Sequence, residues 1–221
     1  MVIFFRELYI AFKISKKRRE YLRYHEIGAI SVPKLPYRVT KRMMDIIISL
    51  PLCLSILPIM FILFGIIIKL TSKGPVIFKQ KRVGTFACEF MCYKFRSMYV
   101  SADDKIVIKS SDQRITPIGR FLRKTHLDEF PQFFNVLKGD MSVVGPRPLP
   151  QKEFEQFRNK KEAYTRLIVR PGITGLAQMK SGRFLPKEDY LQYDIDYLSK
   201  PSLIWDIKLI CQTLKFNDDT C

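Results

Sequence analysis

Two adjacent acidic residues, Asp128 and Glu129, stand where a helix is expected to begin. Apolar residues follow at the spacing i, i+3, i+4 and i+7, namely Phe130, Phe133, Phe134 and Leu137. This spacing predicts an amphipathic helix, with Pro131 in its first turn and Gly139 at its C-terminal end. Unpaired amides and the positive end of the helix dipole would then surround both carboxylates and favour binding of phosphate or a metal–phosphate complex. An acidic pair also caps many helices without further function, so both interpretations stand at this point.

Arginines lie in three segments that could serve such a site. Arg123 comes just before the acidic pair, Arg147 lies between Pro146 and Pro148, and Arg170 directly precedes another proline. Because proline fixes φ, the last two arginines are held in restricted loops. A rigid guanidinium suits bidentate recognition of phosphate, although the same loops could be structural staples.

Two short segments with apolar character, residues 76–78 and 90–95, predict strands. Lys94 and Arg96 lie at the end of the second segment. Cations beside a strand can hold phosphate, but the same cluster would also suit a solvated face or contact lipid headgroups. Residues 101–116 are polar and predict a surface loop.

The element that must carry this site is an uncharged run from Ile46 to Ile68. As a straight helix it would reach roughly 34 Å, enough to cross a hydrocarbon core of about 30 Å. Both flanks are basic, with Lys41 and Arg42 on the N-terminal side, and basic flanks remain cytoplasmic. Pro51 and the mid-run Pro58 each remove an amide donor. We therefore predict a re-entrant helix broken near Pro58, with an ordinary proline-kinked span as the alternative.

The rest of the chain divides around this run. Residues 1–40 predict a basic leader that lies on anionic lipid as an amphipathic helix, packs on the rest of the protein or is disordered, with a linker at Pro33 and Pro36. Residues 41–72 form the predicted membrane segment. Residues 73–221 are long enough for one cytoplasmic domain. Residues 202–216 predict an amphipathic helix that docks on the domain or lies at the membrane interface; we favour the interface.

The amino-acid composition limits the classes of binding partner. The net charge of +17 allows either nucleic acid or an anionic membrane together with a phosphorylated substrate, and the apolar run favours the second. No motif for nucleic-acid binding is present, so we expect no nucleic acid partner. The five cysteines are odd in number and lack zinc-ligand spacing, which indicates reduced thiols.

Several blocks, in this order, resemble the bacterial sugar transferases, which are small monotopic polyprenyl-phosphate phosphoglycosyl transferases. The resemblance runs from about Lys41 to Phe216. The blocks are Lys41-Arg42-x-x-Asp45, the broken apolar run, residues 74–78, Lys94 to Met98, Leu127-Asp128-Glu129, Asn135 to Ser142, Val144 to Pro148, and Arg170 to Gly175.

The resemblance implies an α/β (α+β), mostly helical, monotopic fold with a helix hairpin that is re-entrant at Pro58. A compact catalytic domain with amphipathic interfacial helices would lie on the cytoplasmic face of the inner membrane. It further implies that Asp128 attacks the sugar-linked phosphate of a UDP-sugar, expels UMP and becomes a covalent phosphosugar carrier. Polyprenyl phosphate then accepts the phosphosugar, and Glu129, together with Asp128, holds Mg²⁺.

The chemistry implied by the resemblance requires cations. A carboxylate that attacks a charged pyrophosphate meets repulsion, which Mg²⁺ and fixed arginines must neutralise. Arg123, Arg147 and Arg170 are the candidates, with Lys94 and Arg96 as further ones and Pro146 and Pro148 as the residues that fix the Arg147 loop.

Two single residues depart from the family pattern, and so does Ala87-Cys88-Glu89, where the family has a loop with more glycine and lysine. Leu57 replaces the usual serine before Pro58, so the break could instead depend on Ser55 or Pro51, and Leu176 replaces a usual tryptophan.

The sequence does not specify the sugar or the polymer. It also leaves open the oligomeric state, a homodimer included, and partnership with downstream glycosyltransferases. The alternative function is a non-enzymatic, membrane-anchored basic adaptor that binds anionic lipid or nucleic acid.

Overall fold

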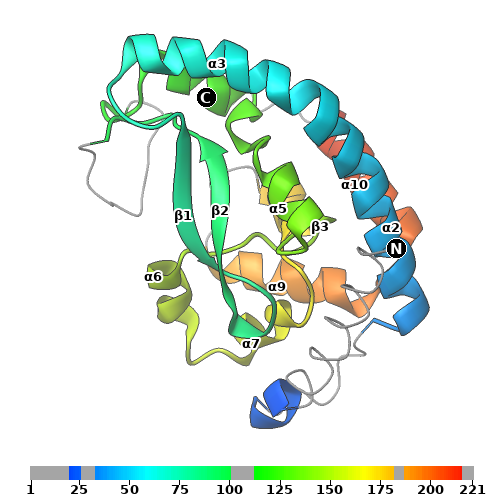
Figure 1. Ribbon diagram of the computed structural model, residues 1–221. Coiled ribbons are helices and arrows are strands. Elements are labelled where there is room, and N and C mark those ends of the chain that lie inside the picture. Colours follow the sequence, from blue (N-terminus) through cyan, green and yellow to red (C-terminus); the bar gives the residue numbers. More distant parts are fainter. Residues whose placement is uncertain (1–19, 26–32, 101–111, 182–186, 216–221) are drawn as a thin grey trace.

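The computed structural model describes residues 20–25, 33–100, 112–181 and 187–215. In these residues the fold is a mixture of helix and sheet that is mostly helical (Figure 1). The leader residues Phe5, Leu8 and Phe12 and most of the loop at 101–116 lie outside the described residues.

A long apolar helix arches along one side of the domain (Figure 1). It comprises α2 (Leu35–Pro51), a π-helical turn (Leu52–Ile56) and α3 (Leu57–Thr71). An 18-residue window of this helix has a mean hydropathy of 2.7, and only 11% of it is buried in the protein. Within the described part of the chain it is the one helix that is long and apolar enough to cross a membrane.

The helix begins earlier than the sequence indicated. We expected a linker at Pro33 and Pro36 before Lys41, but α2 already begins at Leu35 and includes Pro36. This part of the prediction is wrong because Pro36 occupies the first turn of α2, where its missing N–H costs no hydrogen bond.

The helix is interrupted just before Pro58. The N–H of Leu57 donates to the carbonyl of Leu52, five residues back, and Ser55 Oγ donates to the carbonyl of Pro51 at 2.7 Å. The ribbon curves through this region (Figure 1). Since Pro58 cannot donate to a carbonyl in the preceding turn, a local change of hydrogen-bond pattern is the expected accommodation.

One face of α2 is polar and packs on the domain. Arg42, 7% exposed, donates to the carbonyls of Val136 at 2.6 Å and Leu137 at 3.0 Å. Asp45, 1% exposed, accepts a hydrogen bond from Ser142 Oγ at 2.9 Å. The first half of the long helix is thus fixed to the domain by buried polar contacts.

Two small sheets order the domain. Strands β1 (Ile77–Val83) and β2 (Glu89–Phe95) form an antiparallel hairpin, which confirms both expected strands. Strand β1 extends five residues beyond the apolar segment 76–78 that predicted it. Strands β3 (Ser142–Val144) and β4 (Gly172–Thr174) pair in parallel.

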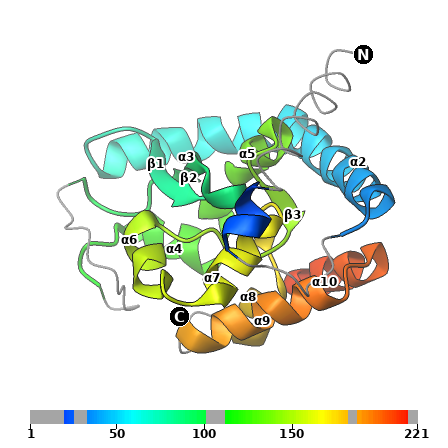
Figure 2. The same cartoon turned by 90° about the horizontal axis from the view of Figure 1, so that it is seen from below.

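The remaining helices surround these sheets. They are α4 (Pro117–Lys124), α5 (Gln132–Lys138), α6 (Gln151–Phe154), α7 (Lys161–Thr165), α8 (Leu176–Ser181), α9 (Lys187–Ser199) and α10 (Leu203–Lys215), with 3₁₀ turns at Thr85–Ala87, Leu127–Glu129, Glu155–Phe157 and Arg166–Ile168. Helices α7 and α9 lie on the side of the domain away from α3 in both views (Figure 1, Figure 2).

Helix α10 combines the two placements that the sequence left open. Asp206 and Leu209 are fully buried against the domain, whereas Ile204 and Ile207 are 81% and 52% exposed. The helix therefore docks on the protein and still presents apolar side chains outward. Cys53, Cys88, Cys92 and Cys211 are free thiols, as expected.

Candidate active site

The acidic pair lies in a 3₁₀ turn, not at the start of a helix. Asp128 and Glu129 belong to the turn Leu127–Glu129, and α5 begins only at Gln132, after Pro131. The predicted placement in the first turn of α5 is therefore wrong. The predicted C-terminal end is confirmed, because Gly139 closes α5 in the left-handed region at φ 88°.

Side-chain cations hold Glu129. Its Oε1 atom lies 2.5 Å from Lys94 Nζ and 3.2 Å from Arg147 Nη2. Burial alone would raise the pKa of Glu129, but the charges of Lys94 and Arg147 outweigh burial and hold the pKa well below its ordinary value. Glu129 is consequently a carboxylate at any physiological pH. The adjacent Asp128 is buried, with 7% of its surface exposed.

Arg82 is a further cation of this site that the sequence analysis missed. Its Nη1 atom donates to the carbonyl of Pro148, and its charge acts on both Arg147 and Glu129. Burial, followed by the nearby Arg147, lowers the pKa of Arg82. The signal was its position: Arg82 lies four residues after the apolar segment 76–78, in a run with two other cations, Lys79 and Lys81. Together, Arg82, Lys94, Asp128, Glu129 and Arg147 are called the Glu129 site below.

The other two cations predicted near the strands and α4 make different contacts. Arg96, 4% exposed, donates to the carbonyls of Ser72 at 2.7 Å and Lys73 at 2.8 Å, just beyond the end of α3. Arg123 Nε donates to Ser97 Oγ at 2.8 Å. Arg96 thus fastens the end of the long helix to β2.

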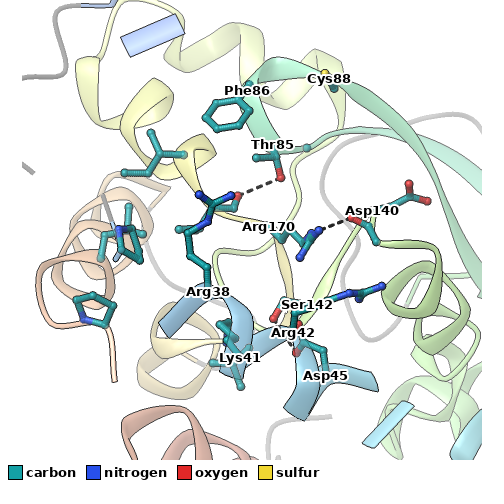
Figure 3. Close-up of a pocket in the computed structure, with 18 of the residues that line it drawn as sticks. Arg38, Lys41, Arg42, Asp45, Thr85, Phe86, Cys88, Asp140, Ser142 and Arg170 are labelled. Carbon is teal, nitrogen blue, oxygen red and sulfur yellow. Dashed lines mark hydrogen bonds between the residues drawn. The ribbon is translucent and has the colours of Figure 1, made fainter. Parts of the chain in front are cut away.

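Arg170 lines a separate cavity of about 260 Å³ between α2, the β1–β2 turn and the segment after α5 (Figure 3). Its Nε atom donates to the carbonyl of Gly139 at 3.0 Å. Arg38, Lys41 and Arg42 also line the cavity, whereas none of the residues of the Glu129 site does. The structure therefore brings together Lys94, Glu129 and Arg147 from the predicted set, but not Arg170.

The acidic pair is compatible with a magnesium ion. Among the described residues, no three His, Cys, Asp or Glu side chains cluster as a complete metal cage. Mg²⁺ does not need such a cage, since it is commonly bound by one or two carboxylates together with water and substrate phosphates. Asp128 and the ionised Glu129 supply two such carboxylates.

The fold and the site define a membrane-associated protein with an acidic site rich in cations beside its apolar helix. The family model described as "Bacterial sugar transferase" matches residues 36–217. The chain belongs to the bacterial sugar transferase family.

Curated relatives carry related names. The chain is 46% identical over 184 residues to the UDP-glucose:undecaprenyl-phosphate glucose-1-phosphate transferase of Klebsiella pneumoniae, covering 80% of this chain and 39% of the relative. It is 36% identical over 202 residues to the UDP-N-acetylgalactosamine-undecaprenyl-phosphate N-acetylgalactosaminephosphotransferase of Aeromonas hydrophila, covering 89% and 47%. The sugar transferase EpsL of Bacillus subtilis is 37% identical over 180 residues, covering 80% and 86%. The chain thus spans less than half the length of the first two relatives.

Proposed function

We propose that this protein transfers a sugar 1-phosphate from a UDP-sugar to undecaprenyl phosphate and releases UMP, the first step in the assembly of a polysaccharide or glycoconjugate. The names of the Klebsiella and Aeromonas relatives support these two substrates. The observation that carries the proposal is the excess of cations at the Glu129 site, where Lys94, Arg82 and Arg147 gather around the acidic pair. Such a site attracts a pyrophosphate.

The position of the site suits a lipid acceptor. Lys94 contacts Glu129, and Arg96, two residues along, contacts the end of α3. Two residues of strand span only about 7 Å. The reacting groups therefore lie close to the end of the apolar helix, where a membrane-bound phosphate and a soluble nucleotide can meet.

The reaction proceeds in two displacements at one phosphorus. An oxygen of Asp128 attacks the sugar-linked phosphorus of the donor, the bond from this phosphorus to the oxygen of the UMP phosphate breaks, and UMP leaves. An oxygen of undecaprenyl phosphate then attacks the same phosphorus and displaces the Asp128 carboxylate. No oxidant and no net proton is required, and the kinetics are ping-pong.

Each nearby group has a role in this scheme. Arg147 neutralises the phosphate oxygens and the departing UMP, and Lys94 holds Glu129 ionised beside the nucleophile. Asp128 and Glu129 would hold Mg²⁺, which when bound supplies further positive charge to the pyrophosphate.

We further propose that residues 41–72 enter and leave the membrane on one side. The cytoplasmic face of the inner membrane would then carry residues 73–221 and the leader, residues 1–40. The π turn at Leu52–Ile56 and the basic flanks support this arrangement. Enzymes that extend the lipid-linked sugar would act next on the same face.

UMP release tests the function. Detergent-purified protein with Mg²⁺ is incubated with a panel of UDP-sugars, with and without undecaprenyl phosphate, beside Asp128→Asn. We expect sustained lipid-dependent release from one donor and a loss of at least about 10³-fold in the variant. Donor alone should leave a phosphosugar mass on the wild-type protein; an adduct that persists in Asp128→Asn would refute the nucleophile.

The same variant tests the alternative function. A basic adaptor would keep its binding to anionic vesicles in Asp128→Asn, since one charge is small beside +17, and would release no UMP in either form. The comparisons give this alternative no support, because the family and the named relatives are transferases.

Cysteine labelling tests the membrane arrangement. In a variant without the native thiols, single cysteines are placed in the leader and at Lys138, which is surface-exposed. We expect an impermeant maleimide to label neither in intact cells and both after permeabilisation. Labelling of the leader alone in intact cells would show a true span.

A further inference from the structure

The segment that carries Arg147 is bound to the rest of the domain at four successive carbonyls. Each carbonyl accepts from a different donor: Pro146 from the amide of Gly172 at 2.9 Å, Arg147 from Arg166 Nη2 at 2.6 Å, Pro148 from Arg82 Nη1, and Leu149 from the amide of Val83 at 2.9 Å. Two donors belong to strands and two are arginine side chains. The direction of the Arg147 side chain therefore depends on Arg166 and Arg82.

Arg166 is itself held by an acid from α9. Arg166 Nη2 lies 2.7 Å from Asp194 Oδ2, and both side chains are 2% exposed. The same nitrogen thus contacts the carboxylate of Asp194 and the carbonyl of Arg147. A buried guanidinium without this carboxylate would turn toward other acceptors or water.

The resulting chain of contacts reaches the acidic pair. It runs from Asp194 on α9 through Arg166 to the main chain of Arg147, whose Nη2 lies 3.2 Å from Glu129 Oε1. Pro146 and Pro148 fix φ on both sides of Arg147, so a shift at its carbonyl is not absorbed locally. Small displacements of a positioned cation lower the rate of phosphoryl transfer strongly.

We propose that Asp194 and Arg166 are positioning residues for catalysis, which hold Arg147 against the departing phosphate without contacting substrate. This inference rests on the proposed function, since it assigns the purpose of a buried ion pair within that reaction. It differs from a purely structural role, because the effect of Asp194 on the rate must pass through the side chain of Arg147.

A double-mutant cycle in kcat tests this dependence. Asp194→Asn keeps the shape of the side chain and removes its charge. In the wild-type background we expect kcat to fall about tenfold and KM for the UDP-sugar to change less than about threefold. In the Arg147→Ala background, already lower by about 10²-fold, we expect Asp194→Asn to cause no further loss.

Asp206→Asn is the matched control. Asp206 also forms a buried ion pair, 2.9 Å from Lys41, and its carboxylate accepts hydrogen bonds from Tyr37, Lys41 and Tyr197, which all lie outside the Arg147 segment. Its effect on kcat, whatever its size, should be the same with and without Arg147. Thermal unfolding of every variant shows whether it is folded, and rates are compared below the lowest melting temperature.

The outcomes separate this inference from the proposed function. If Asp194→Asn lowers kcat equally in both backgrounds, or leaves kcat unchanged in the wild type, the positioning role is refuted while the enzyme remains. If Arg147→Ala does not lower kcat, Arg147 has no role in the rate and the positioning inference is refuted, although the transferase remains. If the wild type releases no UMP, the proposed function fails first. If Asp194→Asn does not fold, Arg166→Lys, which keeps the charge but not the forked geometry, replaces it in the same cycle.

Discussion

Two regions of this molecule are built around a carboxylate paired with a lysine, and they differ in charge balance and in exposure. In the first turn of α10, Asp206 is fully buried and both oxygens are bound: Oδ2 by Lys41 at 2.9 Å and Tyr37 at 2.8 Å, and Oδ1 by Tyr197 at 2.8 Å. One acid meets one cation, and neutral hydroxyls complete the contacts. This cluster joins α2 to the domain, and both oxygens of its carboxylate are already bound.

The Glu129 site has the opposite character. Both contacts of Glu129 are made to Oε1, and the side chains of Glu129, Lys94 and Arg147 are 15%, 17% and 36% exposed. Arg82 adds a further positive charge. The comparison teaches that an ion pair alone does not indicate a candidate functional site, whereas an excess of cations with access to solvent supports one.

The largest effect is expected at the Glu129 site. Glu129→Gln leaves Lys94 and Arg147 without their carboxylate, so kcat should fall by about 10³-fold, which corresponds to about 4 kcal/mol of activation free energy. The free energy of unfolding should fall by less than it does in Asp206→Asn, because the side chains of Glu129, Lys94 and Arg147 are 15%, 17% and 36% exposed and water can replace part of the lost contact. UMP release and urea denaturation measure the two quantities. A large loss of stability with unchanged kcat would make Glu129 a structural residue like Asp206.

The cluster around Asp206 should respond in the reverse way, with its main loss in stability. Asp206→Asn removes the partner charge of buried Lys41, and we expect the free energy of unfolding to fall by about 3 kcal/mol. Tyr37 and Tyr197 can still contact the asparagine, so the variant should fold. Urea denaturation in detergent measures the loss. A value below about 1 kcal/mol would show that the cluster is not what fastens α2.

Asn135, which joins α5 to β2, gives a third, smaller effect. Its side chain accepts from the amide of Tyr93 at 3.1 Å and donates to the carbonyl of Met91 at 2.7 Å, which fixes α5 to the free edge of β2. Asn135→Ala leaves two backbone groups of β2 unpaired and should cost about 2 kcal/mol of unfolding free energy. Because β2 carries Lys94, kcat should also fall. A loss of stability with unchanged kcat would show that Lys94 is positioned independently of α5.

Part of the fold and site was predictable because the signals are local. The alternating residues of β2, the glycine that ends α5 and the proline-flanked Arg147 are each readable within a short segment. The motifs around Lys94, Glu129 and Arg147 were assigned to one site by resemblance, and the structure brings these three side chains together.

The rest depends on contacts between distant segments. Helix α5 begins at Gln132, later than predicted, because residues 127–129 form a separate 3₁₀ turn. Hydrophobic periodicity does not distinguish such a turn from the first turn of the helix. Nothing in the sequence around Arg166 indicates that it meets Asp194 or the carbonyl of Arg147. Arg170, which has the same arginine–proline pattern as Arg147, lies instead in another cavity. Equal local patterns can thus have different tertiary surroundings.

The last and smallest effect concerns pH. Burial raises the pKa of Asp194 to about 6, against which the charge of Arg166 acts only in part. In the unfolded chain the pKa of Asp194 is near its ordinary value of 3.8, so the folded protein binds this proton more tightly. The contribution of Asp194 to stability is therefore full at low pH and is lost as the pH rises through about 6. If Asp194 positions Arg147, the activity depends on pH in the opposite direction to stability. It rises with pH, because only the ionised carboxylate holds Arg166.

We therefore expect kcat to fall about tenfold as the pH drops through about 6, where Glu129, with its lowered pKa, does not titrate. Asp194→Asn should lack this limb and show a low, flat kcat over the same interval, measured by UMP release from about pH 5 to 8. Stability measured in parallel should not fall with Asp194 protonation, which distinguishes a displaced cation from partial unfolding. If the acid limb is unchanged in Asp194→Asn, another group is responsible for the titration, and α9 does not position the Glu129 site.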